Sequence, residues 1–159
     1  MNLFENNIKL LRGHDPELAR RAAEIPLPAD IAVAAAKNGM PVPQVRSILL
    51  HSSYDPGREA QNAVSGFVHD NGRRTAVFGL GFGYHVRELM EKPSGGICVI
   101  EPSLPLFRAF LEHVDLEPFL PATRFWVGEP VPKLLARQRP SEWNLFVHKP
   151  SAQISDEYF

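Results

Sequence analysis

Residues 76–85 read AVFGLGFGYH, and this stretch decides the fold. A short apolar run leads into three glycines, Gly79, Gly81 and Gly83, each separated from the next by one residue. Glycines permit a tight exit from a strand and let the backbone approach a ligand with no Cβ in the way. The pattern predicts a strand, a glycine-rich turn and a helix start, which is how nucleotide-binding α/β domains bring backbone to a ligand.

A second apolar strand, residues 97–100, follows the expected helix and ends at Glu101. This carboxylate stands about 20 residues after the glycines, at the position that binds ribose hydroxyls in such folds. His85 directly follows the turn, and both contact with a ligand and a role at the helix cap or surface remain open for it. The predicted cofactor-binding residues are Gly79, Gly81, Gly83, Tyr84, His85 and Glu101.

The G-x-G-x-G spacing fits S-adenosylmethionine sites better than the dinucleotide G-x-G-x-x-G, so S-adenosylmethionine or a nucleotide is the expected cofactor. Two departures weaken the methyltransferase interpretation. First, such enzymes carry an acidic residue two positions before the first glycine, and this chain has Val77 there. Second, the strand over 144–148 lacks their N/D-P-P-Y/F motif. A tight strand-to-helix turn with no ligand is the structural alternative.

Apolar strands and amphipathic helices alternate from Thr75 onward. We expect strands at 75–79, 96–100, 123–127 and 144–148, with helices at 84–92, 104–114 and 131–138. This order implies a parallel sheet with right-handed crossovers, and hence a Rossmann-like α/β fold. Four strands suggest half of a larger sheet, completed by the hairpin described next, by a partner subunit (a homo-oligomer) or by residues beyond this chain.

The N-terminal part predicts a small appendage of two helices and a β-hairpin, at residues 2–12, 15–25 and 30–45. Asn38-Gly39 is a strong tight-turn signal, although an alanine-rich helix is the alternative for the first strand. Pro41 and Pro43 lack N–H donors on one side of the return strand, which favours an edge strand. We therefore expect an appendage over 1–46 and a Rossmann-like domain over 47–159.

A second polar cluster lies in residues 51–60, HSSYDPGREA, where Asp55 and Pro56 start a helix that we expect to end near 70–72. Its apolar stripe is Ala60, Ala63, Val64, Phe67 and Val68. An anion or ligand could be received by His51, Ser52, Ser53, Tyr54 and Arg58. The favoured alternative is structural, with Asp55 as the helix cap, because its charge would repel an anion there.

Composition restricts the function classes. The chain has 159 residues and a formal net charge of −1, so we expect neither nucleic acid nor a membrane as partner. No apolar run is long enough for a membrane span, and we see no signal peptide, so a cytoplasmic location is expected. Cys98 reads as a buried hydrophobe. The six histidines are scattered without metal-ligand spacing, so no metal site is expected, and no G-x-S-x-G nucleophile elbow occurs. His148 and Lys149 stand at a strand end, where α/β ligands bind.

Three motifs together resemble the N-terminal region of the motility accessory factor family, bacterial proteins of flagellin glycosylation. These are LHSSYDPGREA at 50–60, VFGLGFGYH at 77–85 and VIEP at 99–102. The resemblance implies an accessory domain that binds a nucleotide or nucleotide-sugar, or docks the acceptor. It implies flagellin or a following glycosyltransferase domain as partner, and it assigns no catalytic residue here. A methyltransferase and a ligand-free interaction domain are the alternative functions.

Overall fold

The computed structural model describes residues 1–70, 72–92, 95–130, 133 and 143–155. Its helices are α1 (Leu3–His14), α2 (Pro16–Glu24), α3 (Pro56–Ser65), α4 (Tyr84–Met90), α5 (Leu104–His113), the 3-10 turn η1 (Glu117–Phe119) and α7 (Lys149–Gln153). Its strands are β1 (Ile31–Ala35), β2 (Pro41–Val45), β3 (Ile48–Leu49), β4 (Thr75–Phe78), β5 (Ile97–Glu101), β6 (Thr123–Val127) and β7 (Asn144–Val147). The helix expected over 131–138 lies outside the described residues.

The parallel sheet confirms the predicted Rossmann-like architecture. Its four strands lie in the order β6-β5-β4-β7, and every neighbouring pair is parallel. The chain therefore runs outward from β4 through β5 to β6 and then returns to the other side of β4. Val77 and Val99 are paired across β4 and β5 and are fully buried, as expected for central strands of a parallel sheet.

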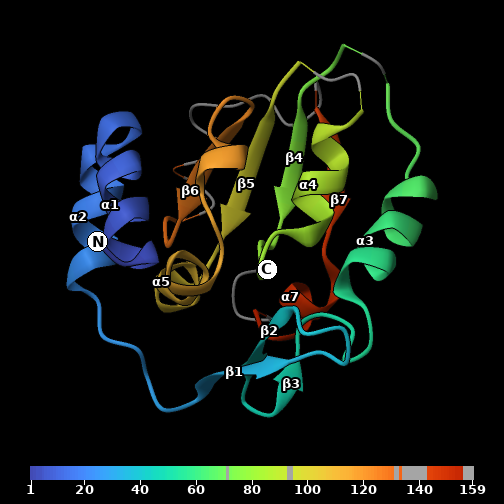
Figure 1. The fold of residues 1–159 in the computed structure, drawn as a ribbon. Helices are drawn as coiled ribbons and strands as arrows, with labels where there is room; N and C mark the ends of the chain where they lie inside the picture. The colour runs from blue at the N-terminus through green and yellow to red at the C-terminus, as the bar shows by residue number, and fades with distance from the viewer. Residues whose placement is uncertain (71, 93–94, 131–132, 134–142, 156–159) are drawn as a thin grey trace.

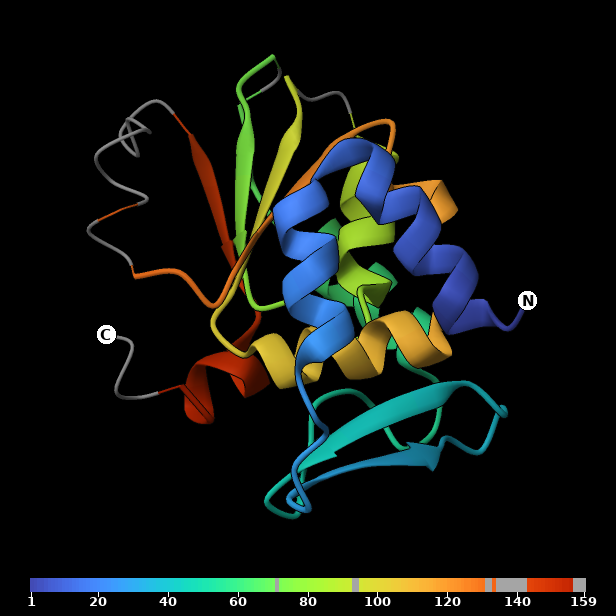
Figure 2. The same cartoon turned by 90° about the vertical axis from the view of Figure 1, so that its left-hand side faces the viewer.

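Helices α1, α2, α4 and α5 lie on the same side of this sheet, and α1 and α2 pack against α5 (Figure 2). A single core joins the sheet to these helices, with a centre of aromatic rings at Phe107, Phe110, Phe119 and Phe125. The helices expected at 2–12 and 15–25 are thereby confirmed as α1 and α2, and Leu11 and Leu18 contribute to the shared core.

The hairpin forms a sheet of its own. Strands β1 and β2 are antiparallel, with Ile31 opposite Val45, so the strand interpretation of residues 31–36 is confirmed over β1. The edge position expected for the return strand is wrong, because β2 lies between β1 and β3. The prolines are tolerated because β3 pairs only with Gln44 and Val45, which leaves most of the proline side of β2 without a ladder.

The hairpin does not add strands to the parallel sheet. The suggestion that the hairpin completes that sheet is therefore wrong. The small sheet lies instead across the end of the molecule at which the parallel strands have their carboxyl ends, with α7 beside it (Figure 1). Backbone hydrogen bonds also join it to the segment before α3, from Lys37 N to Ser53 O and from Asn38 N to Tyr54 O. The edge where α/β proteins bind ligands is thus covered by the protein itself.

Helix α3 is shorter than expected. It ends at Ser65, and the N–H of Gly66 closes its last turn. Ala60 and Val64 are buried as predicted, but Val68 lies beyond the helix and is 92% exposed. The helical spacing of apolar residues in the sequence continues past Ser65, where the helix ends. Val68 therefore does not belong to the buried face of α3.

The short helix α7 directly follows His148 at the end of β7. Among the described residues, no helix combines the length and the hydropathy that a membrane span requires.

Candidate functional site

The glycine turn lies at the topological switch point of the sheet. Strands β5 and β7 flank β4 on opposite sides, and Gly79 and His148 directly follow β4 and β7. In open α/β sheets the crevice at this point is the usual place for a ligand. The strand, turn and helix start predicted over 76–85 are therefore confirmed, and the turn lies at the end of the sheet that was expected.

All three glycines adopt positive φ angles, 94° at Gly79, 53° at Gly81 and 78° at Gly83. The space in front of each one holds a side chain of the same protein. A Cβ on Gly79 would overlap Ser151, one on Gly81 would come within 2.5 Å of His51 Nε2, and one on Gly83 would lie 2.9 Å from Phe119 Cζ.

Glu101 faces the turn and is 1% exposed. Its Oε1 accepts a hydrogen bond from the Leu80 N–H at 3.0 Å, and its Oε2 accepts one from the Ser103 N–H at 2.9 Å. Burial raises the pKa of this carboxyl above its ordinary value, and the bonds from the backbone of Ser103, Leu80 and Gly81 oppose the shift. Glu101, which was predicted to bind the ribose hydroxyls of a cofactor, is thus hydrogen-bonded to the backbone of the glycine turn that was predicted to bind the same cofactor.

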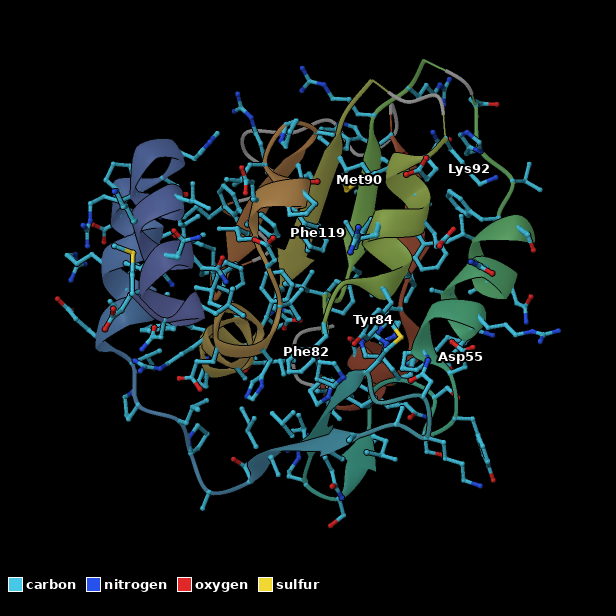
Figure 3. All side chains as sticks on the ribbon, viewed as in Figure 1. Asp55, Phe82, Tyr84, Met90, Lys92 and Phe119 are labelled. Atoms are coloured by element: carbon cyan, nitrogen blue, oxygen red, sulfur yellow. The ribbon has the colours of Figure 1, made fainter. Side chains whose placement is uncertain are left out.

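Tyr84 connects the start of α4 to the small sheet, toward which its side chain points in Figure 3. Its hydroxyl donates a 2.6 Å hydrogen bond to the Pro41 carbonyl, and its ring meets that of His51 edge-on at 5.0 Å. Burial raises the pKa of the Tyr84 hydroxyl to about 12. This predicted site residue therefore holds the covering sheet in place.

The fold brings together three histidines that are distant in sequence. His51 follows β3, His85 lies in the first turn of α4, and His148 follows β7. The rings of His85 and His148 stack with centroids 4.3 Å apart, and His51 lies 5.0 Å from His148. One ring nitrogen from each residue lies within 4.8 Å of those of the other two. The histidines were expected to be scattered, and for these three that expectation is wrong, because the strand order of the parallel sheet and the place of the small sheet bring their segments to one edge.

These three side chains are buried and neutral at pH 7. Burial lowers the pKa of His85 to about 4, and the bond to the Gly79 carbonyl opposes that shift. Burial also holds the pKa of His51 and of His148 well below the ordinary value, and the neighbouring histidines add to both shifts. Neutral imidazoles can accept hydrogen bonds or ligate a metal, because each keeps one ring nitrogen unprotonated.

The other residues of the 51–60 cluster are separated from the turn, and only His51 reaches it, where its Nε2 accepts a 2.9 Å hydrogen bond from the Phe82 N–H. Asp55 caps α3 by accepting from the Arg58 N–H at 2.9 Å. The Ser52 hydroxyl accepts from the N–H groups of Tyr54 and Asp55. Ser53, Tyr54 and Arg58 are exposed. The cluster thus divides into a buried histidine and an exposed helix start.

A cavity of about 860 Å³ lies away from the turn, near the amino ends of β5 and β6. Cys98 borders this cavity but is only 8% exposed, and burial raises the pKa of its thiol to about 11. The interpretation of Cys98 as a buried hydrophobe is confirmed.

The fold and the switch-point turn define a Rossmann-like α/β protein. No protein-family model matches the chain. An uncharacterized protein of Treponema pallidum (strain Nichols) is 32% identical over 173 residues, covering 98% of this chain and 59% of that protein. The chain therefore spans less than two thirds of the curated relative that it matches.

Among solved structures, the MAf glycosyltransferase from Magnetospirillum magneticum AMB-1 has a similar fold. The TM-score is 0.68 at 18% identity, over 98% of this chain and 34% of that one. MNMC2 from Aquifex aeolicus matches at a TM-score of 0.41 and 14% identity, over 87% of this chain and 60% of that one. The first likeness shows that nearly the whole chain shares its fold with part of a larger glycosyltransferase.

Proposed function

We propose that this chain is a non-catalytic accessory domain of a bacterial glycosylation protein, and that it docks the acceptor polypeptide, flagellin. The shared fold with part of the MAf glycosyltransferase supports this proposal. So does the sequence resemblance to the motility accessory factor family, which includes the glycine turn and the segment over 50–60.

The main support for docking rather than nucleotide binding is that side chains of the protein itself occupy the glycine turn. Glu101 is bonded to the turn backbone, and His51 accepts the N–H of Phe82. Ser151 lies against Gly79, and the small sheet covers this edge. A nucleotide at the turn would have to displace buried groups that are already hydrogen-bonded, at a cost of about 1–3 kcal/mol for each group left unpaired. Protein docking at another surface requires no such displacement.

A binding experiment with flagellin tests the proposal. Unglycosylated and glycosylated flagellin monomers from the source organism are immobilised, and the purified chain is titrated over both. We expect saturable binding that is stronger on the unglycosylated form, and no consumption of nucleotide-sugar by the chain alone. If the chain binds neither form of flagellin, acceptor docking is overturned. If the isolated chain transfers sugar, the non-catalytic role is overturned.

A nucleotide or S-adenosylmethionine site is the second candidate, because Gly79, Gly81 and Gly83 stand at the switch point where such ligands bind. Thermal-shift measurements with S-adenosylmethionine, S-adenosylhomocysteine and cytidine nucleotides test it. Saturation at 100 times the dissociation constant would stabilise the fold by about 2.7 kcal/mol. A shift that disappears in Glu101→Ala would favour this candidate over docking.

A further inference from the structure

The histidine cluster, His51, His85 and His148, fills the crevice in which this fold class usually holds a ligand. The three side chains come from three separate segments, and none is more than 8% exposed. Burying three imidazoles at one point is unusual for a core, since each ring carries a polar atom that needs a partner.

His85 presents a nitrogen without a partner. Its Nε2 lies 2.7 Å from the Gly79 carbonyl oxygen, and because a carbonyl only accepts, Nε2 carries the proton. In the neutral ring Nδ1 therefore has a lone pair but no hydrogen, and within the described residues this buried atom has no hydrogen-bond partner. An unpaired acceptor away from water is costly, so the site favours a Lewis acid or a donor.

His148 offers a second nitrogen. Its Nδ1 lies 2.7 Å from the Ser151 hydroxyl, which can rotate away from it. The Leu50 backbone bonds to the same ring. A backbone carbonyl that holds one ring nitrogen is the arrangement that metal sites use to orient their histidines, and the other nitrogen can ligate once the Ser151 hydroxyl turns away.

His51 completes the cluster and is the most constrained member, since its Nε2 accepts the Phe82 N–H. Ligation through Nε2 releases that N–H, and ligation through Nδ1 requires the other tautomer. The three nitrogens, now within 4.8 Å of one another, must close to about 3.4 Å to surround a metal at 2.0–2.1 Å, and the stacked rings of His85 and His148 must turn out of parallel to do so.

We propose that His51, His85 and His148 bind one divalent transition metal ion of the zinc class. Three nitrogen ligands without a carboxylate suit Zn²⁺, Co²⁺, Ni²⁺ or Cu²⁺ and do not suit Mg²⁺ or Ca²⁺, which take oxygen. The rings are neutral at pH 7, so no proton competes for the lone pairs. The ion joins the end of β3, the start of α4 and the end of β7, and so ties the covering sheet to the parallel sheet.

A Co²⁺ titration of the wild-type chain tests the proposal directly. The protein carries no polyhistidine tag and is first treated with a chelator. We expect one Co²⁺ per chain, visible ligand-field absorption of a four- or five-coordinate site, release of the Co²⁺ by Zn²⁺ and a higher melting temperature with Zn²⁺. No saturable one-to-one binding to the folded wild-type chain would overturn the proposal, whatever the variants do.

Matched variants assign the ligands. Second-sphere changes cost about 10–100-fold in metal affinity, so His85→Gln and His148→Gln should each weaken Zn²⁺ binding by at least about 100-fold. His14→Gln at an exposed position should leave the affinity unchanged. Equal affinities of His85→Gln and His14→Gln, each with a wild-type circular dichroism spectrum, would overturn the assignment. The flagellin-binding experiment has a separate readout, so the two proposals fail independently.

Discussion

Gly79 is a residue of the turn against which Ser151 of α7 lies. Its φ of 94° is strained for any side chain, and a Cβ there would overlap Ser151. Gly39 has a similar φ of 88° with nothing within 4 Å of the added Cβ, so it isolates the backbone strain. We expect Gly39→Ala to cost about 1–2 kcal/mol, and Gly79→Ala to cost about 1–3 kcal/mol more.

Urea denaturation of the two alanine variants measures this difference. Adding Ser151→Gly to Gly79→Ala should recover about 1 kcal/mol or more relative to the sum of the single changes, because the overlapping Cβ is removed. Equal costs at Gly79 and Gly39 would show that the turn is open in solution.

Glu101 is expected to stabilise the fold through its two backbone bonds. Glu101→Gln replaces one accepting oxygen by an NH₂ group, which leaves either the Leu80 or the Ser103 N–H unpaired. We expect a loss of about 1–3 kcal/mol in the free energy of unfolding. Calorimetry at pH 7 checks it, and an unchanged melting temperature would contradict the bonding described for this carboxylate.

The roles of single residues were predictable from the sequence only where the local backbone geometry determines them. The glycines, the cap at Asp55 and the position of Glu101 follow from turn and cap chemistry. The meeting of His51 with His148 does not, because it depends on the strand order and on the place of the small sheet. Each member of the cluster had a local signal of its own, His85 beside the glycines, His51 in the second polar cluster and His148 at a strand end, but none of these signals indicated that the three meet.

At the scale of elements, Asp55 connects a helix to a hairpin. Its Oδ1 accepts from the Arg58 N–H and from the Asn38 side-chain amide at 3.2 Å. Asp15 caps α2 in the same Asp-Pro context and accepts from the Leu18 N–H. We expect Asp55→Ala to cost about 1–2 kcal/mol and to cost more than Asp15→Ala, as measured by urea denaturation. A larger loss at Asp15 would contradict the bridging role.

Most elements were predictable because their boundaries are marked by proline, glycine and cap residues. The errors have physical causes. The apolar period beyond Ser65 led to an α3 that is too long. The apolar run over 48–50 predicts a short strand, which β3 confirms, but no local signal shows what that strand pairs with. Its pairing with Gln44 and Val45 is a long-range event that turned an expected edge strand into a central one.

At the scale of the whole molecule, Asn7 holds α1 to the α/β core. Its side chain donates to the carbonyls of Leu111 and Val114 and accepts from the Leu116 N–H, all at 2.7–3.0 Å. We expect Asn7→Ala to lower the free energy of unfolding by about 3 kcal/mol, since two buried backbone groups and one partly buried one lose their partner. The exposed neighbour Asn6→Ala should stay within about 0.5 kcal/mol of wild type.

Denaturation followed by circular dichroism and by tryptophan fluorescence checks this prediction. One coincident transition is expected, since α1, α2 and the sheet share a core. An early transition that removes only the N-terminal helices, with Asn7→Ala matching Asn6→Ala, would contradict it. The alternation of strands and helices predicted the parallel sheet, whereas the covering of its carboxyl edge depended on tertiary packing.

Closure of the glycine turn by the protein's own groups separates acceptor docking from nucleotide binding. Amide hydrogen exchange at Leu80 and Phe82, whose N–H groups donate to Glu101 and His51, tests it most directly. We predict that both amides are protected as strongly as those of β4, and that neither shifts when S-adenosylmethionine or a cytidine nucleotide is added. Rapid exchange at both amides, with chemical shifts that move on nucleotide addition, would contradict the claim.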